Sequence, residues 1–115
     1  MAQTQIQERR SAPRIPVNHS ILAEVPSQEK VFGTTSDVSF NGVGFFAEKP
    51  LPPGAPLAVH LELEDPEDHR YHDYDLEGFV AHCIDTMENG YHIGVQLKQP
   101  PQDYVTVVEH LTRTH

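Results

Sequence analysis

Short apolar segments follow one another along this chain and are separated by residues typical of turns. Strict alternation, as in residues 57–64, places every second side chain on one buried face and predicts a half-buried strand. Continuous apolar segments bounded by glycine or proline also predict strands. On this basis we predict six strands, at residues 20–25, 31–37, 42–47, 57–64, 76–84 and 91–97.

The C-terminal segment has a helical period instead. After two prolines, apolar residues recur at i, i+3, i+4 and i+7, and this spacing predicts a helix over about residues 102–113. The residues that carry the period are Tyr104, Val107, Val108 and Leu111. Six short strands followed by one helix predict a mainly β fold, a six-stranded antiparallel β-barrel with a C-terminal α-helix.

The N-terminal residues are predicted to be less ordered than the rest of the chain. Residues 1–16 show no period and contain prolines that favour extended geometry, so we expect a flexible N-terminal arm over 1–16 and the barrel domain over 17–115. Within the barrel, the acidic residues 65–75 are predicted to form a solvated hairpin loop, and Asn89-Gly90 predicts a tight turn.

Composition limits the class of protein. The chain has 115 residues, which is one domain, and 17 acids against 8 bases give a net charge of −9. This balance argues against binding long nucleic acid. No apolar run is long enough for membrane insertion, the N-terminus lacks a secretory signal, and the single Cys83 excludes an internal disulfide, so we expect a cytoplasmic protein. No recognisable catalytic motif is present, and we do not expect an enzyme.

The charges are distributed unevenly along the sequence. Arg9, Arg10 and Arg14 form a basic cluster near the N-terminus, whereas residues 62–77 contain eight acids and one base. A small ligand with several negative charges is attracted to the first region and repelled by the second. The layout therefore indicates a binding site near the N-terminal arginines.

Two short motifs carry the candidate chemistry. The first is Arg10-xxx-Arg14, whose guanidinium groups can grip phosphate or the O6/N7 edge of guanine and can stack on a purine. The second is Asp37-x-Ser39-xx-Gly42. Its carboxylate can accept hydrogen bonds from guanine N–H groups, and its glycine allows close backbone approach. Together they indicate recognition of a guanine nucleotide.

In these motifs the sequence resembles the PilZ domain family of bacterial cyclic di-GMP receptors, and the resemblance covers roughly residues 8–112. It implies a split-barrel fold of six strands, with an N-terminal arm that closes over the ligand. It also implies that Arg10 and Arg14 bind phosphates and guanine, while Asp37, Ser39 and Gly42 hold the guanine at the barrel surface.

The resemblance implies further details. An arginine directly before the first motif, here Arg9, goes with an intercalated pair of cyclic di-GMP molecules, whereas a hydrophobic residue goes with a single molecule. Family members often place Trp or Arg on the fifth strand against the purine, and this chain has His82 there. We expect a stand-alone receptor without a prosthetic group, which orders its arm on binding and regulates an unidentified effector protein in trans.

Two alternatives remain open at the sequence level. The first is a PilZ-like barrel that acts only as a protein–protein interaction module and binds no nucleotide. The second is a metal-responsive domain built on the acidic, histidine-containing loop, although histidines on a long loop are not a preformed zinc site. The candidate ligands there are Asp68, His69, His72, Asp73 and Asp75. We expect no specific metal.

Overall fold

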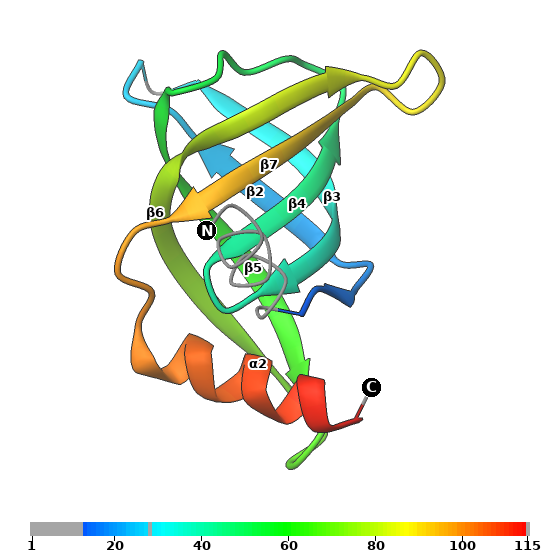
Figure 1. Ribbon diagram of the computed structural model, residues 1–115, viewed down its shortest axis with the longest axis vertical. Helices are drawn as coiled ribbons and strands as arrows, with labels where there is room; N and C mark the ends of the chain where they lie inside the picture. Colours follow the sequence, from blue (N-terminus) through cyan, green and yellow to red (C-terminus); the bar gives the residue numbers. More distant parts are fainter. Residues whose placement is uncertain (1–12, 28, 115) are drawn as a thin grey trace, which may run out of the picture.

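The computed structural model describes residues 13–27 and 29–114, which form seven strands and one helix (Figure 1). The strands are β1 (Ile15–Pro16), β2 (Ser20–Glu24), β3 (Lys30–Ser39), β4 (Gly42–Ala47), β5 (Pro56–Asp65), β6 (Arg70–Asp85) and β7 (Tyr91–Leu97). The helix is α2 (Gln102–Thr114).

Six of these strands close into a barrel. All pairings are antiparallel and follow the order β3-β2-β5-β6-β7-β4, and the sheet closes because β4 also pairs with β3. The long strand β3 makes closure possible: residues 30–34 pair with β2, and residues 33–39 pair with β4. The predicted six-stranded antiparallel barrel with a C-terminal helix is confirmed.

The core fills the barrel with alternating side chains. Phe45, Leu63 and Ile93 are fully buried and come from three different strands. Helix α2 lies across one end of the barrel, as Figure 1 shows, and buries the four residues whose period predicted it, Tyr104, Val107, Val108 and Leu111. The ring of Tyr104 packs edge-to-face on that of Tyr74, with their centroids 5.9 Å apart. The helix therefore completes the core.

The β5–β6 hairpin is longer than predicted. Strand β6 begins at Arg70, and only residues 66–69 form the turn, so the prediction of a loop over 65–75 is wrong for its second half. The reason is that the acids alternate with inward residues: Tyr74 and Leu76 are buried, whereas Asp73 and Asp75 face solvent. Acidic composition obscured a period-2 strand.

The N-terminal segment meets the barrel at a short strand. Ile15 is buried and pairs with Val38, and Pro16 pairs with Asp37, so β1 lies along the same edge of β3 as β2, beyond the residues that pair with β2. The division into an arm over 1–16 and a barrel over 17–115 stays a prediction, because residues 1–12 lie outside the described part. Within the described residues, no helix is both long and apolar enough to cross a membrane.

Candidate nucleotide-binding site

Arg14 and Asp37, which come from the two sequence motifs, lie in direct contact. Nη1 of Arg14 is 2.5 Å from Oδ1 of Asp37, although the residues are 23 positions apart in sequence. Strand β1 causes this meeting, because its pairing of Pro16 with Asp37 brings the preceding residues alongside β3. The guanidinium is about half exposed, so part of its donor fork faces solvent.

Asp37 begins a row of residues that crosses four strands on the outer wall. Asp37 pairs with Gly44 on β4, Gly44 pairs with Gly94 on β7, and Gly94 pairs with His82 on β6. We call these four residues the glycine row. Both outer members follow an irregularity in register, one between Thr35 and Asp37 and the other between residues 80 and 82. Bulges of this kind re-aim side chains and are common beside functional sites.

The two glycines leave room for the side chains at each end. A Cβ on Gly94 would lie 2.7 Å from Nδ1 and 2.8 Å from Nε2 of His82, closer than real Cβ atoms approach. A Cβ on Gly44 would lie 3.0 Å and 3.1 Å from the two carboxylate oxygens of Asp37. The imidazole of His82 therefore lies over Gly94, and the carboxylate of Asp37 lies over Gly44.

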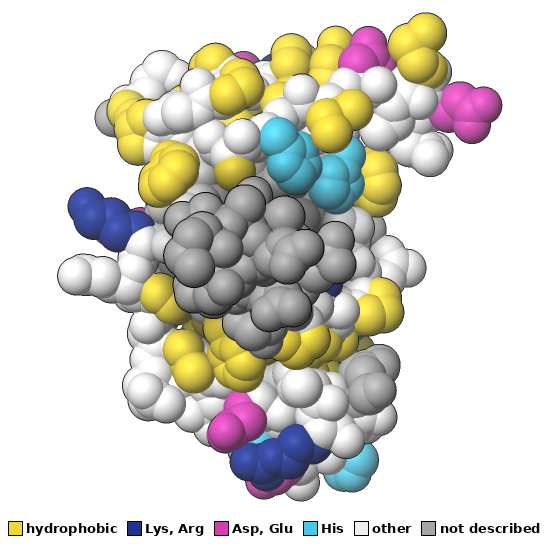
Figure 2. Space-filling view, viewed as in Figure 1, with side chains coloured by type: hydrophobic (Ala, Val, Ile, Leu, Met, Phe, Trp, Pro, Cys, Tyr) yellow, Lys and Arg dark blue, Asp and Glu magenta, His cyan; other side chains and the backbone are white. Residues whose placement is uncertain are grey.

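A chain of hydrogen bonds joins the two ends of the row. Oγ of Ser36 donates to Oδ2 of Asp37 over 3.1 Å and also lies 3.1 Å from Nε2 of His92. Nδ1 of His92 lies 3.2 Å from Nε2 of His82, and the two rings are stacked with centroids 5.3 Å apart. Figure 2 shows histidine side chains side by side on the face that presents β4 and β7.

The direction of these bonds follows from the carboxylate, which can only accept. Ser36 uses its hydroxyl hydrogen on Asp37, so it must accept a hydrogen bond from Nε2–H of His92. Nδ1 of neutral His92 then has a lone pair, and it accepts from Nε2–H of His82. Burial, and next the neighbouring His82, lower the pKa of His92 below its usual value, in agreement with a neutral ring.

The second motif is held from beneath by helix α2. The hydroxyl of Tyr104 donates to the backbone carbonyl of Ser39 over 2.7 Å, and both residues are buried. Oγ of Ser39 is used within the turn, where it bonds to Asn41 over 3.1 Å. Burial raises the pKa of Tyr104, so this phenol remains a donor at any ordinary pH. The helix thus fixes the turn that follows Asp37.

The structure places four predicted site residues on this wall and others elsewhere. Asp37 and His82 are the two ends of the glycine row, Arg14 contacts Asp37, and a Cβ on Gly42 would lie 3.4 Å from Nη2 of Arg14. Ser39 is buried behind the motif. Arg9 and Arg10 lie outside the described residues. That all of these contact a ligand stays a prediction.

Sequence reasoning missed Ser36 and His92, the two links between the ends of the row. His92 could have been found from the sequence, because alternation along Tyr91–Leu97 places it on the outer face with Gly94. Ser36 could not, because its outward position depends on the irregularity in β3.

The residues of the predicted metal alternative are only partly together. Ligand atoms of Asp65, Asp68 and His72 lie within 4.8 Å of one another, but His69 is not in this group. Nε2 of His72 is hydrogen-bonded to Asp68, which lowers the pKa of that carboxyl. Asp75 instead faces His60 on β5. These residues lie on a partly exposed acidic hairpin and hydrogen-bond to one another. The metal-responsive alternative therefore stays untested.

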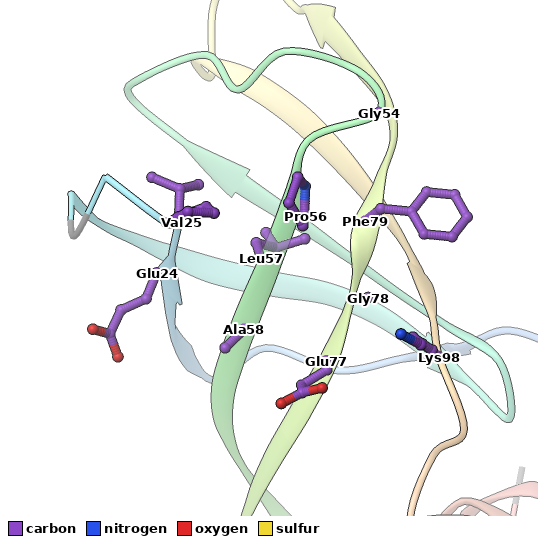
Figure 3. A pocket seen from close by; sticks show the side chains of 11 residues that line it. Glu24, Val25, Gly54, Pro56, Leu57, Ala58, Glu77, Gly78, Phe79 and Lys98 are labelled. Carbon is purple, nitrogen blue, oxygen red and sulfur yellow. The ribbon is translucent and has the colours of Figure 1, made fainter.

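A surface hollow lies away from the glycine row. It has a volume of about 750 Å³ and is open to solvent between the end of β2, the start of β5 and the middle of β6 (Figure 3). Phe79 and Lys98 stand along one side, and Glu24 stands across from them. None of the residues of the two sequence motifs lines it.

The closed barrel, its capping helix and the arginine beside Asp37 define a small β-barrel domain with a polar site on its outer wall. This chain belongs to the PilZ domain family, whose model matches residues 8–113. No curated protein sequence is similar enough to this chain to count as a relative.

Solved PilZ structures have the same fold. The Bacillus subtilis inhibitor of motility MotI/DgrA has a TM-score of 0.76 at 14% identity, over 92% of this chain and 51% of that one. The PilZ domain of Escherichia coli YcgR with c-di-GMP gives 0.58 at 12% identity, over 92% and 90%. The K. pneumonia MrkH–c-di-GMP complex gives 0.64 at 18%, over 91% and 51%. This chain thus spans about half the length of MotI and of MrkH.

Proposed function

We propose that this protein is a receptor for cyclic di-GMP that binds the second messenger on the glycine row and regulates a partner protein. Membership of the PilZ family supports the ligand, and two structures of the same fold, those of YcgR and MrkH, contain c-di-GMP. The observation that carries the proposal is the contact between Arg14 and Asp37, which joins the two motifs at one place on the barrel.

The chemistry of the row suits a guanine nucleotide. The carboxylate of Asp37 can accept the N1–H and N2–H groups of guanine, while the exposed part of the Arg14 guanidinium donates to phosphate or to O6 and N7. The two glycines let the side chains of Asp37 and His82 lie close against the sheet, and in this proposal the guanine binds over these side chains. Arg10 supplies further phosphate contacts in this proposal, and Arg9 selects an intercalated pair of ligand molecules.

The proposed output is an interaction in trans. Apolar side chains border the site: Ile84 pairs with His92, and it is more than half exposed. Phe46, on the other side of His92, packs its ring edge-to-face on the imidazole, with the ring centroids 4.9 Å apart. A partner that reads the occupied site therefore meets an apolar surface beside the ligand, which is typical of protein interfaces. A cytoplasmic location stays part of the proposal.

Titration calorimetry tests the receptor function directly. Cyclic di-GMP should bind, GMP and GTP should bind far more weakly, and the stoichiometry should decide between one and two molecules. Arg14→Ala should lose most of the affinity, because charge-assisted hydrogen bonds contribute about 1.5–3 kcal/mol each. Arg113→Ala is the matched control, since Arg113 lies on α2, away from the motifs, where it pairs with Glu67 and Glu109.

The same titration followed by NMR shows what an absence of binding would mean. Amide shifts on β3, β4 and β7 should accompany binding. If the wild-type protein gives neither heat nor amide shifts at high micromolar ligand, the receptor function is wrong. A protein partner that then co-purifies through the barrel would support the interaction module instead.

A further inference from the structure

The hydrogen-bond chain beside the glycine row determines which nitrogen of His82 carries hydrogen. Nε2 of His82 must donate to Nδ1 of His92, because every link back to the carboxylate of Asp37 has a fixed direction. In a neutral imidazole one nitrogen donates and the other accepts. Nδ1 of neutral His82 is therefore a bare acceptor.

This acceptor lies over the row where the ligand is proposed to bind. The ring of His82 lies against Gly94, since both Nδ1 and Nε2 would be within 2.8 Å of a Cβ there, and Nε2 is already used on His92, so Nδ1 is the nitrogen left for a ligand on this wall. Phosphate oxygens and the O6 and N7 atoms of guanine are themselves acceptors only. Such a ligand atom meets a lone pair on His82 unless Nδ1 first gains a proton.

We propose that binding of cyclic di-GMP is coupled to the uptake of up to one proton by His82. The inference rests on the proposed function and adds a regulation to it. In the imidazolium form, Nε2–H still donates to His92, and Nδ1–H donates to the ligand. The negative charge of the phosphates favours the same form.

The groups around His82 limit the uptake to one proton for the histidine pair. Two imidazolium rings would point hydrogens at each other across the 3.2 Å between Nε2 of His82 and Nδ1 of His92. At the neighbouring ring of His92, Asp37 from β3 raises the pKa and Arg14 from the N-terminal segment lowers it. From β4, the uncharged Phe46 packs against His92.

Calorimetry in buffers of different ionisation enthalpy measures the coupling. The apparent binding enthalpy of cyclic di-GMP should vary linearly with that of the buffer, and the slope should give an uptake above zero and at most one proton per site. By linkage, the affinity should then fall by up to about tenfold for each unit by which the pH rises. Ring ¹⁵N shifts of His82 should change to those of an imidazolium on binding.

Variants separate the coupling from binding itself. His82→Gln should bind with no proton uptake, and His92→Phe should also lose uptake, because Nε2 of His82 is then free to be the acceptor while Nδ1–H faces the ligand. His72→Gln, on the distant hairpin, is the control and should keep the wild-type slope.

The outcomes distinguish this inference from the proposed function. Binding of cyclic di-GMP with a zero slope, or an unchanged slope in His82→Gln, overturns the proton coupling alone. Absence of any binding by the wild-type protein overturns the proposed function, and the coupling with it.

Discussion

Substitution of Gly94 by alanine tests whether the glycine row works through the imidazole of His82. The backbone of Gly94 does not lie in the left-handed region, so alanine can adopt it. The new Cβ would overlap Cε1, Nδ1 and Nε2 of His82, all of which belong to one side chain. The ring must turn away, and its contact with His92 is lost, while the strand can stay in place.

The size of the effect follows from that geometry. Loss of the proposed His82 contact with the ligand costs about 1–3 kcal/mol, the range of a base-stacking or charge-assisted contact, which is roughly a 5- to 150-fold weaker affinity for cyclic di-GMP. The free energy of unfolding should change by less than about 1 kcal/mol, because alanine reduces the entropy of the unfolded chain by a compensating amount. Calorimetry measures the affinity, and urea denaturation measures the stability.

Gly78→Ala is the contrasting variant on the same pair of strands. Its Cβ would overlap the backbone carbonyl oxygen of Gln96 and lie 3.0 Å from the carbonyl carbon, which no side-chain rotation can relieve. This variant should lose stability, whereas Gly94→Ala should lose affinity. Wild-type affinity in a folded Gly94→Ala protein would refute a role for His82, and equal destabilisation of both variants would refute the steric argument.

Three other substitutions test separate parts of the structure. Tyr104→Phe removes the buried hydrogen bond to the Ser39 carbonyl, so it should lower the free energy of unfolding by about 1–3 kcal/mol and the melting temperature by several degrees; an unchanged melting curve would contradict this. In His60, the hydrogen bond to Asp75 raises the pKa above 6.5 against the opposing effect of burial, and Glu24 adds to the rise. The stabilisation is therefore complete below pH 6.5 and is lost as the pH rises through the folded-state pKa of His60. Urea denaturation should show the wild-type protein losing stability relative to His60→Gln between about pH 6 and about pH 8. Parallel pH profiles of the two proteins would argue against this. Asp37→Asn should remove most ligand affinity but cost less than about 1 kcal/mol of stability, since its partly exposed ion pair is weak; calorimetry and urea denaturation check the two effects, and a large loss of stability would show that the pair is structural.

Most of the fold could be predicted because its strands obey a simple period. Residues 42–47 and 91–97 form strands with the predicted bounds, and the spacing of Tyr104 to Leu111 gave the helix. The start of β6 was missed because its outward positions are acidic, and composition was given more weight than alternation. The two-residue strand β1 is too short to have a period of its own.

The site divides in the same way between local and non-local information. Motif spacing pointed to Arg14 and Asp37, and the barrel brings them into contact. The link through Ser36 and His92 depends on an irregularity in β3 and on which strands are neighbours in the closed sheet. Neither can be read from a motif, because both are properties of the paired strands.

The short strand β1 also bears on the thermodynamics of binding. Ile15 is only 2% exposed and is paired with Val38, so its backbone is already ordered before any ligand arrives. Fixing a residue costs about 1–2 kcal/mol of conformational entropy, and for Ile15 and Pro16 folding of the barrel has already met this cost. Arg14, next to this anchor, is therefore preorganised, and more of its interaction energy appears as affinity.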